Sequence, residues 1–355
     1  MKYIITAFTL ALSSLVFTQA VMANNDYKGD YKKSYKKDYT EDYKKAVPPK
    51  KAVLPVDLVK ADFAVMVLGS SGPVATSNGR AGSSLLIFVE GKPTLVIDTG
   101  SGSFKSLALS GATLADAHQF LYTHMHIDHT SDMSAMVKSL FFHRLGAGLL
   151  LPPAINFYGP DSDVPAYDSM SAYVDGHYDA SIGVERYLHG FAAAFFGGQS
   201  PFVPIGHNLP FDVSSNAITD VLYDHTGVSV KSIPVFHGGT PSVAYRVEYK
   251  GKSIVWTGDT NSSTDNIIKL AKKADVLIYD TAILDNPTPE FLLMFHTTPT
   301  RLGEVAAKAK PKKLVLSHLS ATTEANIYSI KKIIKSQGYR GKIIPAEDLQ
   351  VINVW

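Results

Sequence analysis

The chain contains one stretch in which three imidazoles and one carboxylate fall within six positions, His124-Met-His126-Ile-Asp128-His129. Neutral imidazole and carboxylate are the ligands that borderline cations such as Zn²⁺ prefer. The stretch follows the apolar run Phe120–Leu121, and a strand there would point His124 and His126 the same way. Asp128 and His129 come as the chain leaves that strand, so they can face a second centre. The alternative is a histidine-rich surface turn, but this composition after an apolar strand favours a metal site.

Other apolar runs also end at a residue that could bind a metal. They end at Asp98, His237, Asp259, Asp280 and His318. One such residue can arise by chance, but several that complement the histidine cluster favour a shared site.

Alternating apolar runs and Gly-rich turns predict many short strands and few helices. Strands are predicted over residues 63–68, 84–89, 94–97, 228–236, 242–249, 253–256, 276–279 and 313–316, and helices over 131–145 and 299–309. Residues 146–220 are rich in Gly, Pro and aromatic residues and give no regular pattern. They form a possible insertion that caps a substrate pocket. Histidines in or beside this region are interpreted as ordinary surface or core residues: His143, His177, His189, His207 and His225.

Composition excludes several classes of protein. The chain has 355 residues and a formal net charge of +2, but residues 24–51 hold nine Lys and five Asp or Glu. After Lys51 there remain 24 basic and 27 acidic residues, so the body is not a polyanion binder by bulk charge. The absence of cysteine excludes a disulfide scaffold, a thiol nucleophile, Cys-ligated zinc and a lipoprotein cysteine.

The first residues are typical of a secretory signal peptide. Lys2 is followed by the apolar run 4–17 and by Val21-Met22-Ala23, a small-residue cleavage site. The protein is therefore expected to be periplasmic or secreted, with no transmembrane segment after cleavage. An uncleaved membrane anchor is the alternative, although the apolar run is short for a span.

Residues 24–55 are predicted to be a disordered linker. Tyrosine recurs every four residues from Tyr27 to Tyr43 among lysines and acids, without an aliphatic residue that could build a core. A solvated tether is the preferred interpretation, and contact of this Tyr/Lys array with an anionic envelope surface is the other. Residues 56–355 are expected to form the folded domain.

Together the chemistry-bearing residues resemble the metallo-β-lactamase fold superfamily, in its dinuclear hydrolase branch. The similarity spans about Asp62 to Trp355 and follows the family's motif order. It implies an α/β fold, a four-layer αββα sandwich of two mixed sheets with helices outside and the metals at one edge. It also implies two Zn²⁺ ions, with Mn²⁺ or Fe possible.

The resemblance implies a role for each residue of the motifs. His124, His126 and His237 would bind one zinc, and Asp128, His129 and His318 the other. Asp259 would bridge both ions, and Asp98 would orient the cluster from behind.

Three features resemble the ribonuclease Z and phosphodiesterase branch. They are Leu68–Pro73 with Arg80 and Ser83-Ser84, His237 followed by Pro241 and Tyr245-Arg246, and His296-Thr297-Thr298. In such enzymes the last motif assists the leaving group, so His296 would take that role, with Asp128 helping to position the nucleophile. A helix-capping surface histidine is the alternative for His296. Homodimers are common in that branch.

These features predict a phosphodiesterase that uses a metal-bridging hydroxide. The chain lacks a clear tRNA-gripping arm, and the expected export would separate it from tRNA, so a small-molecule or oligomeric ester is the expected substrate. Lactonase, β-lactamase-type and arylsulfatase-like activities remain alternatives. β-Lactamases as a family lack the Gly258-Asp259-Thr260 element, whereas lactonases share every ligand. A non-enzymatic adhesive role for residues 24–51 is a further alternative.

Overall fold

The structure, a computed structural model, describes residues 53–223 and 225–355. The predicted signal peptide over residues 1–23 and the linker up to residue 52 lie outside the described residues. Pro55–Leu58 form a short 3₁₀-helix, η1, which includes one residue that the sequence analysis assigned to the linker. Among the described residues, no helix is both long and apolar enough to cross a membrane.

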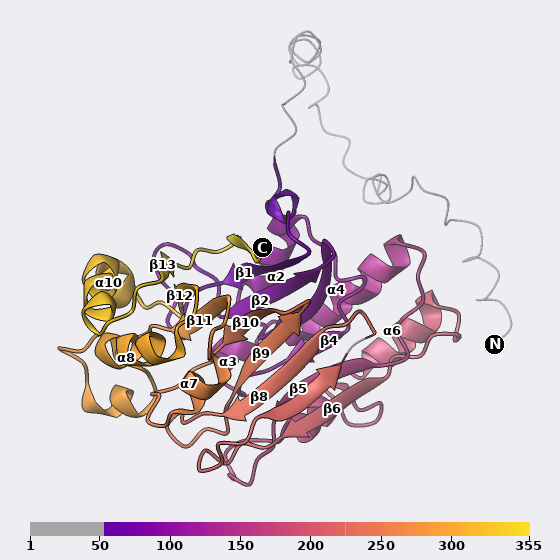
Figure 1. The fold of residues 1–355 in the computed structure, drawn as a ribbon. Helices are drawn as coiled ribbons and strands as arrows, with labels where there is room; N and C mark the ends of the chain where they lie inside the picture. Colours follow the sequence, from indigo (N-terminus) through magenta and orange to yellow (C-terminus); the bar gives the residue numbers. More distant parts are fainter. Residues whose placement is uncertain (1–52, 224) are drawn as a thin grey trace, which may run out of the picture. The chain divides into compact units, whose positions relative to one another are not determined.

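Two seven-stranded mixed sheets pack face to face in the described part of the chain (Figure 1). The first sheet has the strand order β14-β1-β2-β3-β4-β5-β6, and the second has the order β13-β12-β11-β10-β9-β8-β7. The first comprises β1 (Phe63–Gly69), β2 (Ser84–Val89), β3 (Lys92–Ile97), β4 (Gln119–Leu121), β5 (Ile155–Pro160), β6 (Pro204–Leu209) and β14 (Val351–Asn353). The second comprises β7 (Thr219–Tyr223), β8 (Ser229–Pro234), β9 (Val243–Tyr249), β10 (Lys252–Trp256), β11 (Val276–Asp280), β12 (Lys313–Ser317) and β13 (Lys342–Pro345).

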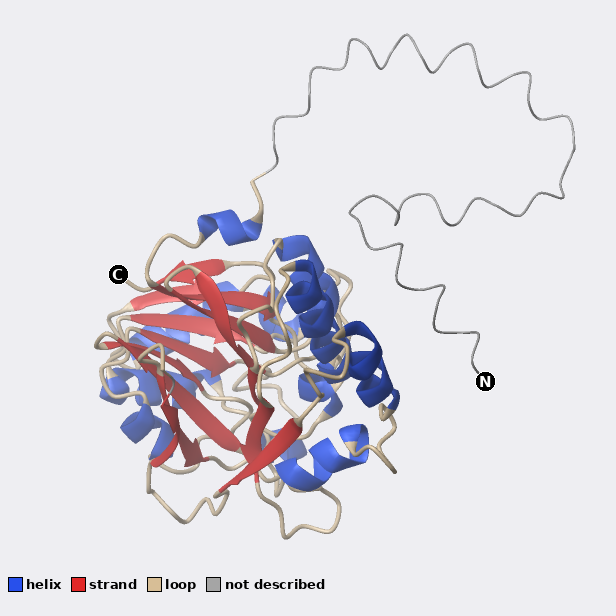
Figure 2. Cartoon of the chain, turned by 90° about the vertical axis from the view of Figure 1, so that its right-hand side faces the viewer, coloured by secondary structure: helices blue, strands red, loops and turns tan. Residues whose placement is uncertain are grey.

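Helices cover the outer face of each sheet, as Figure 2 shows. The first sheet is covered by α2 (Ser103–Ser110), α4 (Met133–Gly146), α5 (Met170–Tyr178) and α6 (Tyr187–Phe195), and the second by α7 (Asn266–Leu270), α8 (Pro299–Ala309) and α10 (Ile327–Ser336). Shorter turns are α3 (Ile127–Thr130), α9 (Ala321–Ala325) and the 3₁₀-helix η2 (Glu290–Met294). The αββα prediction is confirmed.

Strand periodicity explains why this arrangement forms. In β1, every residue is buried, and alternate side chains point to opposite faces. Phe63, Val65 and Val67 enter the core between the sheets, whereas Met66 and Leu68 pack beneath the outer helices. A strand buried on both faces has a continuous apolar sequence rather than an alternating one.

Residues 146–220 extend the first sheet and supply two of its helices. They supply β5 and β6, which extend the sheet in parallel beyond β4, and the helices α5 and α6. The sequence pattern did not indicate β6 because Pro204, Gly206 and His207 interrupt its apolar residues and the strand is only half-buried. Helix α4 begins at Met133 after Asp132 at its N-cap, two residues later than predicted.

The topology brings the carboxyl ends of several strands to one edge. β3 and β4 are parallel, as are β10, β11 and β12. β8 runs in the direction of β10 because both are antiparallel to β9. The two sheets are joined there, since the Val243 N–H donates to the Thr123 carbonyl at 2.9 Å and the Tyr245 hydroxyl donates to the Tyr122 carbonyl at 2.8 Å.

Candidate metal centre

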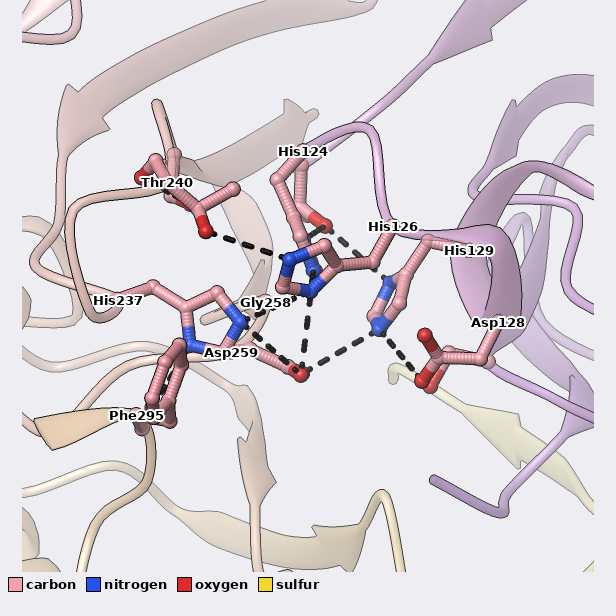
Figure 3. A network of polar contacts seen from close by, with 12 residues as sticks. His124, His126, Asp128, His129, His237, Thr240, Gly258, Asp259 and Phe295 are labelled. Atoms are coloured by element: carbon pink, nitrogen blue, oxygen red, sulfur yellow. Dashed lines mark hydrogen bonds and ion pairs between the residues drawn. The ribbon is translucent and has the colours of Figure 1, made fainter. Parts of the chain in front are cut away.

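Three histidines from both sheets converge at this edge (Figure 3). His124 follows β4, His126 precedes α3, and His237 follows β8. His124 Nε2 lies 3.0 Å from His126 Nδ1, which lies 3.2 Å from His237 Nε2. His124 and His237 are buried. One small cation could therefore contact all three nitrogen atoms.

A second set lies beside the first and consists of Asp128, His129, Asp259 and His318, all buried. The Asp259 carboxylate, after β10, is 3.4 Å from His129 Nε2 and 3.1 Å from His318 Nε2. Its Oδ2 is also 3.8 Å from His237 Nε2. Asp259 thus stands between the two sets and can serve both.

The remaining ring nitrogens of the first set are held by neighbouring groups. His124 Nδ1 lies 3.1 Å from the Thr123 hydroxyl, and His237 Nδ1 donates to the Phe295 carbonyl at 2.8 Å. His126 Nε2 lies 3.3 Å from the Thr240 hydroxyl and 3.2 Å from the Tyr167 hydroxyl. These contacts leave the facing nitrogens with free lone pairs and orient the rings.

Asp98, at the end of β3, organises the second set from behind. Its carboxylate accepts hydrogen bonds from the Thr123 N–H at 2.8 Å, from Trp256 Nε1 at 2.8 Å and from His129 Nδ1 at 3.0 Å. A proton on His129 Nδ1 leaves Nε2 as the ligand atom. Asp98 therefore selects the tautomer that can bind a metal.

A third group adjoins the second set. His296 is 8% exposed, and its Nδ1 donates to Asp280 Oδ2 at 2.9 Å. The other oxygen of Asp280 lies 3.4 Å from His318 Nδ1. The His296 ring is 5.5 Å from the His237 ring and 5.3 Å from the His318 ring. His296 is therefore beside both ligand sets and is not a surface cap, a position that Thr298 occupies at the start of α8.

The backbone at the site adopts conformations that are uncommon for most residues. Asp98 and His318 have φ of +57° and +55°, values that cost free energy and cluster at functional sites. Gly258 has φ of +55°, and a Cβ there would lie 2.6 Å from the Thr123 Cβ. Only glycine therefore allows Asp259 to approach His124 from the opposite sheet.

Burial keeps the three-histidine set neutral. It lowers the pKa of His124 well below its ordinary value, lowers that of His126, and lowers that of His237 to about 4. Neutral imidazoles have the lone pairs that a metal requires.

The second set is electrostatically different because carboxylates surround its imidazoles. Burial opposes a charge on His129, but Asp259, Asp128 and Asp98 raise its pKa to about 10. Burial would raise the pKa of Asp128, yet His129 and His318 lower it to about 2. Without a metal, the protonated imidazoles of this set therefore form ion pairs with its carboxylates. A bound cation would neutralise the same carboxylates.

The donor set fits two divalent metals. His129 Nε2 and Asp259 Oδ1 are buried without a hydrogen-bond partner although they face each other, and such orphaned atoms are costly unless a ligand satisfies them. Zinc bonds of about 2.0–2.2 Å in a tetrahedron separate neighbouring ligands by roughly 3.4 Å. Four neighbouring contacts within the two sets, His124–His126, His126–His237, His129–Asp128 and His129–Asp259, measure 3.0 to 3.5 Å and are close to this value.

The structure brings together every residue that the sequence nominated for the centre: Asp98, His124, His126, Asp128, His129, His237, Asp259, His296 and His318. The sequence noted Asp280 only as a residue at a strand end and gave it no role. Trp256, Tyr167 and Thr240 were also missed, because their contacts span 158, 41 and 114 positions.

The other histidines have different surroundings. His143, His177, His189 and His207 make hydrogen bonds remote from the centre. Neither these four nor His225 belongs to a potential metal-binding group within the described residues. Their interpretation as ordinary residues agrees with this geometry.

Comparisons with known proteins show what this chain is similar to. A family model described as "Beta-lactamase superfamily domain" matches residues 168–319. Ribonuclease Z of Mycolicibacterium paratuberculosis is 25% identical over 298 residues, which cover 82% of this chain and 98% of that protein.

Solved structures show the same fold at lower identity. The metallo-beta-lactamase fold protein YhfI from Bacillus subtilis aligns with a TM-score of 0.59 and 17% identity, covering 82% of this chain and 98% of YhfI. The short form of human tRNase Z aligns with a TM-score of 0.57 and 20% identity, covering 82% of this chain and 99% of that one.

Proposed function

We propose that this chain, a metallo-β-lactamase fold hydrolase related to ribonuclease Z, is a dinuclear zinc phosphodiesterase. One observation carries the proposal: Asp259 lies between the two ligand sets, and the His296–Asp280 pair lies beside both. A pair of metal sites with a shared carboxylate is the arrangement used to stabilise both oxygens of an in-line displacement.

The residues divide into two ligand groups and a bridge. His124, His126 and His237 would hold one ion, Asp128, His129 and His318 the other, and Asp259 both. When bound, the ions supply water activation at neutral pH and polarisation of the phosphoryl group. Imidazole and carboxylate donors without sulfur suit zinc, although Mn²⁺ and Fe accept the same donors.

The protein's own groups would handle the protons and the positioning. Hydrolysis forms a bond from phosphorus to the water oxygen and breaks the bond to the leaving oxygen, which must gain a proton. Asp280 holds His296 Nδ1 at 2.9 Å and, with Asp259, raises the pKa of His296 against the effect of burial. These carboxylates favour the protonated form of His296, which could donate from Nε2 to the leaving oxygen. Asp128 would orient the attacking water.

This acid suits a substrate whose leaving group is strongly basic, such as an alkoxide, because such a group gains most from a proton donor. The choice of a phosphodiester rests on the similarity to ribonuclease Z, an enzyme that cleaves phosphodiesters in RNA. Lactone, sulfate ester and β-lactam hydrolysis are the competing outcomes of the test.

The test combines metal analysis with a substrate panel on the full chain. The panel contains bis-p-nitrophenyl phosphate, p-nitrophenyl sulfate, an N-acyl homoserine lactone and a cephalosporin. We expect about two zinc ions per chain, cleavage of the phosphodiester, and loss of that activity in His124→Ala and Asp259→Ala. Turnover of the lactone or the cephalosporin without the diester would refute the choice of substrate, and absence of metal after zinc reconstitution would refute the mechanism.

His296 is tested by changing the leaving group. In p-nitrophenyl methyl phosphate the leaving group is p-nitrophenolate, an anion that leaves without a proton. We therefore expect His296→Ala to lower the turnover of this diester only slightly. Turnover of a diester with an alkoxide leaving group should fall about 10²–10⁴-fold. His207→Ala is the control, because His207 binds Asn156 far from the centre. Equal losses for both leaving groups would rule out the acid role.

Location outside the cytoplasm is part of the proposal. It is supported by Lys2, the apolar run 4–17 and the small residues 21–23. Cell fractionation of the full chain tests it, with mass spectrometry of the N-terminus to find cleavage after Ala23. Recovery of the intact chain only from the cytoplasm would contradict it.

A further inference from the structure

An open hollow of about 370 Å³ adjoins the ligand sets, and its lining residues are of two chemical kinds. Five of them are polar: His126, Asp128, His237, Asp259 and His296. Five are apolar and are together called the apolar wall: Pro73, Ile127, Phe291, Leu292 and Phe295. A volume of this size suits a small molecule.

The apolar wall exposes large side chains at the place where a substrate must enter. Ile127 is 76% exposed and Phe291 is 61% exposed, so neither contributes much to the stability of the core. A single exposed apolar residue is ordinary. Here two of them line the same hollow as His126 and Asp128, and Ile127 stands between these two ligands in the chain.

The wall is attached to the centre through η2. The Gly238 N–H donates to the Met294 carbonyl at 3.0 Å, and the Phe295 carbonyl accepts from His237 Nδ1 at 2.8 Å. The Phe295 ring packs so closely that a Cβ on Gly238 would lie 2.1 Å from it. Phe291 is therefore placed at a defined position relative to His237 (Figure 3 shows Phe295 beside His237).

The charge of the surroundings opposes a polyanion. A second hollow of about 430 Å³ also includes His237 and is lined by Asp163 and Asp212 together with apolar and small residues. Neither hollow has a lysine or arginine among its described lining residues. Nucleic acid binding depends on such cations along the phosphate backbone, so neither surface is suited to hold a strand.

We propose, on the basis of the proposed function, that the substrate is a small phosphodiester with an apolar alkyl or aryl group that lies against Ile127 and Phe291. The phosphoryl group lies at the ligand sets, and the apolar group is removed from water when it packs against the apolar wall. Each fully enclosed methylene would raise kcat/KM by up to roughly fourfold. Because the hollow is open, lengthening methyl to butyl should give about a tenfold increase.

The experiment uses three diesters that release p-nitrophenolate: the methyl, butyl and thymidine p-nitrophenyl phosphates. In the zinc-loaded full chain, we expect the butyl ester to exceed the methyl ester about tenfold and to exceed the thymidine ester. Phe291→Ser should reduce the butyl-to-methyl ratio to about threefold or less. Tyr328→Ser is the matched control, since Tyr328 is an aromatic residue that is 72% exposed on α10, and it should keep the wild-type ratio.

A binding measurement separates this inference from the proposed function. Calorimetric titration with methylphosphonate and butylphosphonate needs no turnover, and the butyl compound should bind more tightly to the wild type but not to Phe291→Ser. If no diester is cleaved and this binding difference persists, the phosphodiesterase proposal fails and the apolar subsite stands. If diesters are cleaved but chain length alters neither rate nor binding, or the thymidine ester is preferred, the apolar subsite is refuted.

Discussion

Replacing Asp98 with asparagine tests how the centre is organised, because it changes one atom and the charge. Three N–H donors point at the Asp98 carboxylate, from Thr123, His129 and Trp256. Asparagine offers one acceptor oxygen and one donor group in the same space. If the oxygen keeps the Thr123 N–H, the amide NH₂ faces the two N–H groups of His129 and Trp256.

The size of the effect follows from these contacts. Two buried donors without an acceptor cost about 1–3 kcal/mol each, so Asp98→Asn should lower the free energy of unfolding by about 2–6 kcal/mol. His129 can accept from the new amide only by moving its proton from Nδ1 to Nε2, which removes a ligand atom. We therefore expect the zinc affinity of the site that contains His129 to fall about 10–100-fold.

Urea unfolding in the presence of a chelator measures the loss of stability, and competition with a zinc-binding dye measures the affinity. Asp275→Asn is the matched control. Asp275 is also buried and accepts from the Ser253 N–H at 2.8 Å and from Lys312 Nζ at 2.7 Å, but it precedes β11 rather than following it. The control should lose stability and keep both affinities. Wild-type zinc affinity at both sites of Asp98→Asn would refute the assigned role of Asp98.

Three further predictions concern metal, backbone and pH. Zinc at a hundredfold excess over its Kd should stabilise the protein against thermal unfolding by about 2.7 kcal/mol. Asp259→Ala should abolish most of this gain, and a gain equal to that of the wild type would contradict the bridging role. Gly258→Ala, strained by its φ of +55° and by contact with Thr123, should lose about 2–4 kcal/mol in urea unfolding, and an unchanged midpoint would refute the packing argument. His143 accepts from the Leu114 N–H at 2.9 Å, and burial lowers the pKa of its imidazole. Because the unfolded chain binds this proton more readily, the free energy of unfolding should fall as the pH drops below about 6.5. His143→Asn keeps an acceptor without titrating and should show a shallower fall in unfolding midpoint; parallel pH profiles would exclude His143 as the cause.

Proximity in the chain accounts for what sequence analysis predicted well at the centre. His124, His126, Asp128 and His129 occupy six consecutive positions after an apolar strand, so their grouping requires no knowledge of the fold. The motif order then related His237, Asp259 and His318 to the same centre through the resemblance to a known superfamily. The αββα architecture followed from that resemblance, and the continuous apolar runs, such as that of β1, agree with strands buried on both faces.

The sequence by itself therefore determined the donor chemistry, because residue types and short spacings are local properties. It indicated the class of fold through the resemblance that the motif order carries. Tertiary structure alone decided which distant residues meet. Strand order placed Trp256 on Asp98, and it placed Asp280 between His296 and His318. It also brought Phe291 and Asp128 to the lining of one hollow. These contacts depend on which strand ends share an edge, and neither apolar periodicity nor turn residues specify strand order.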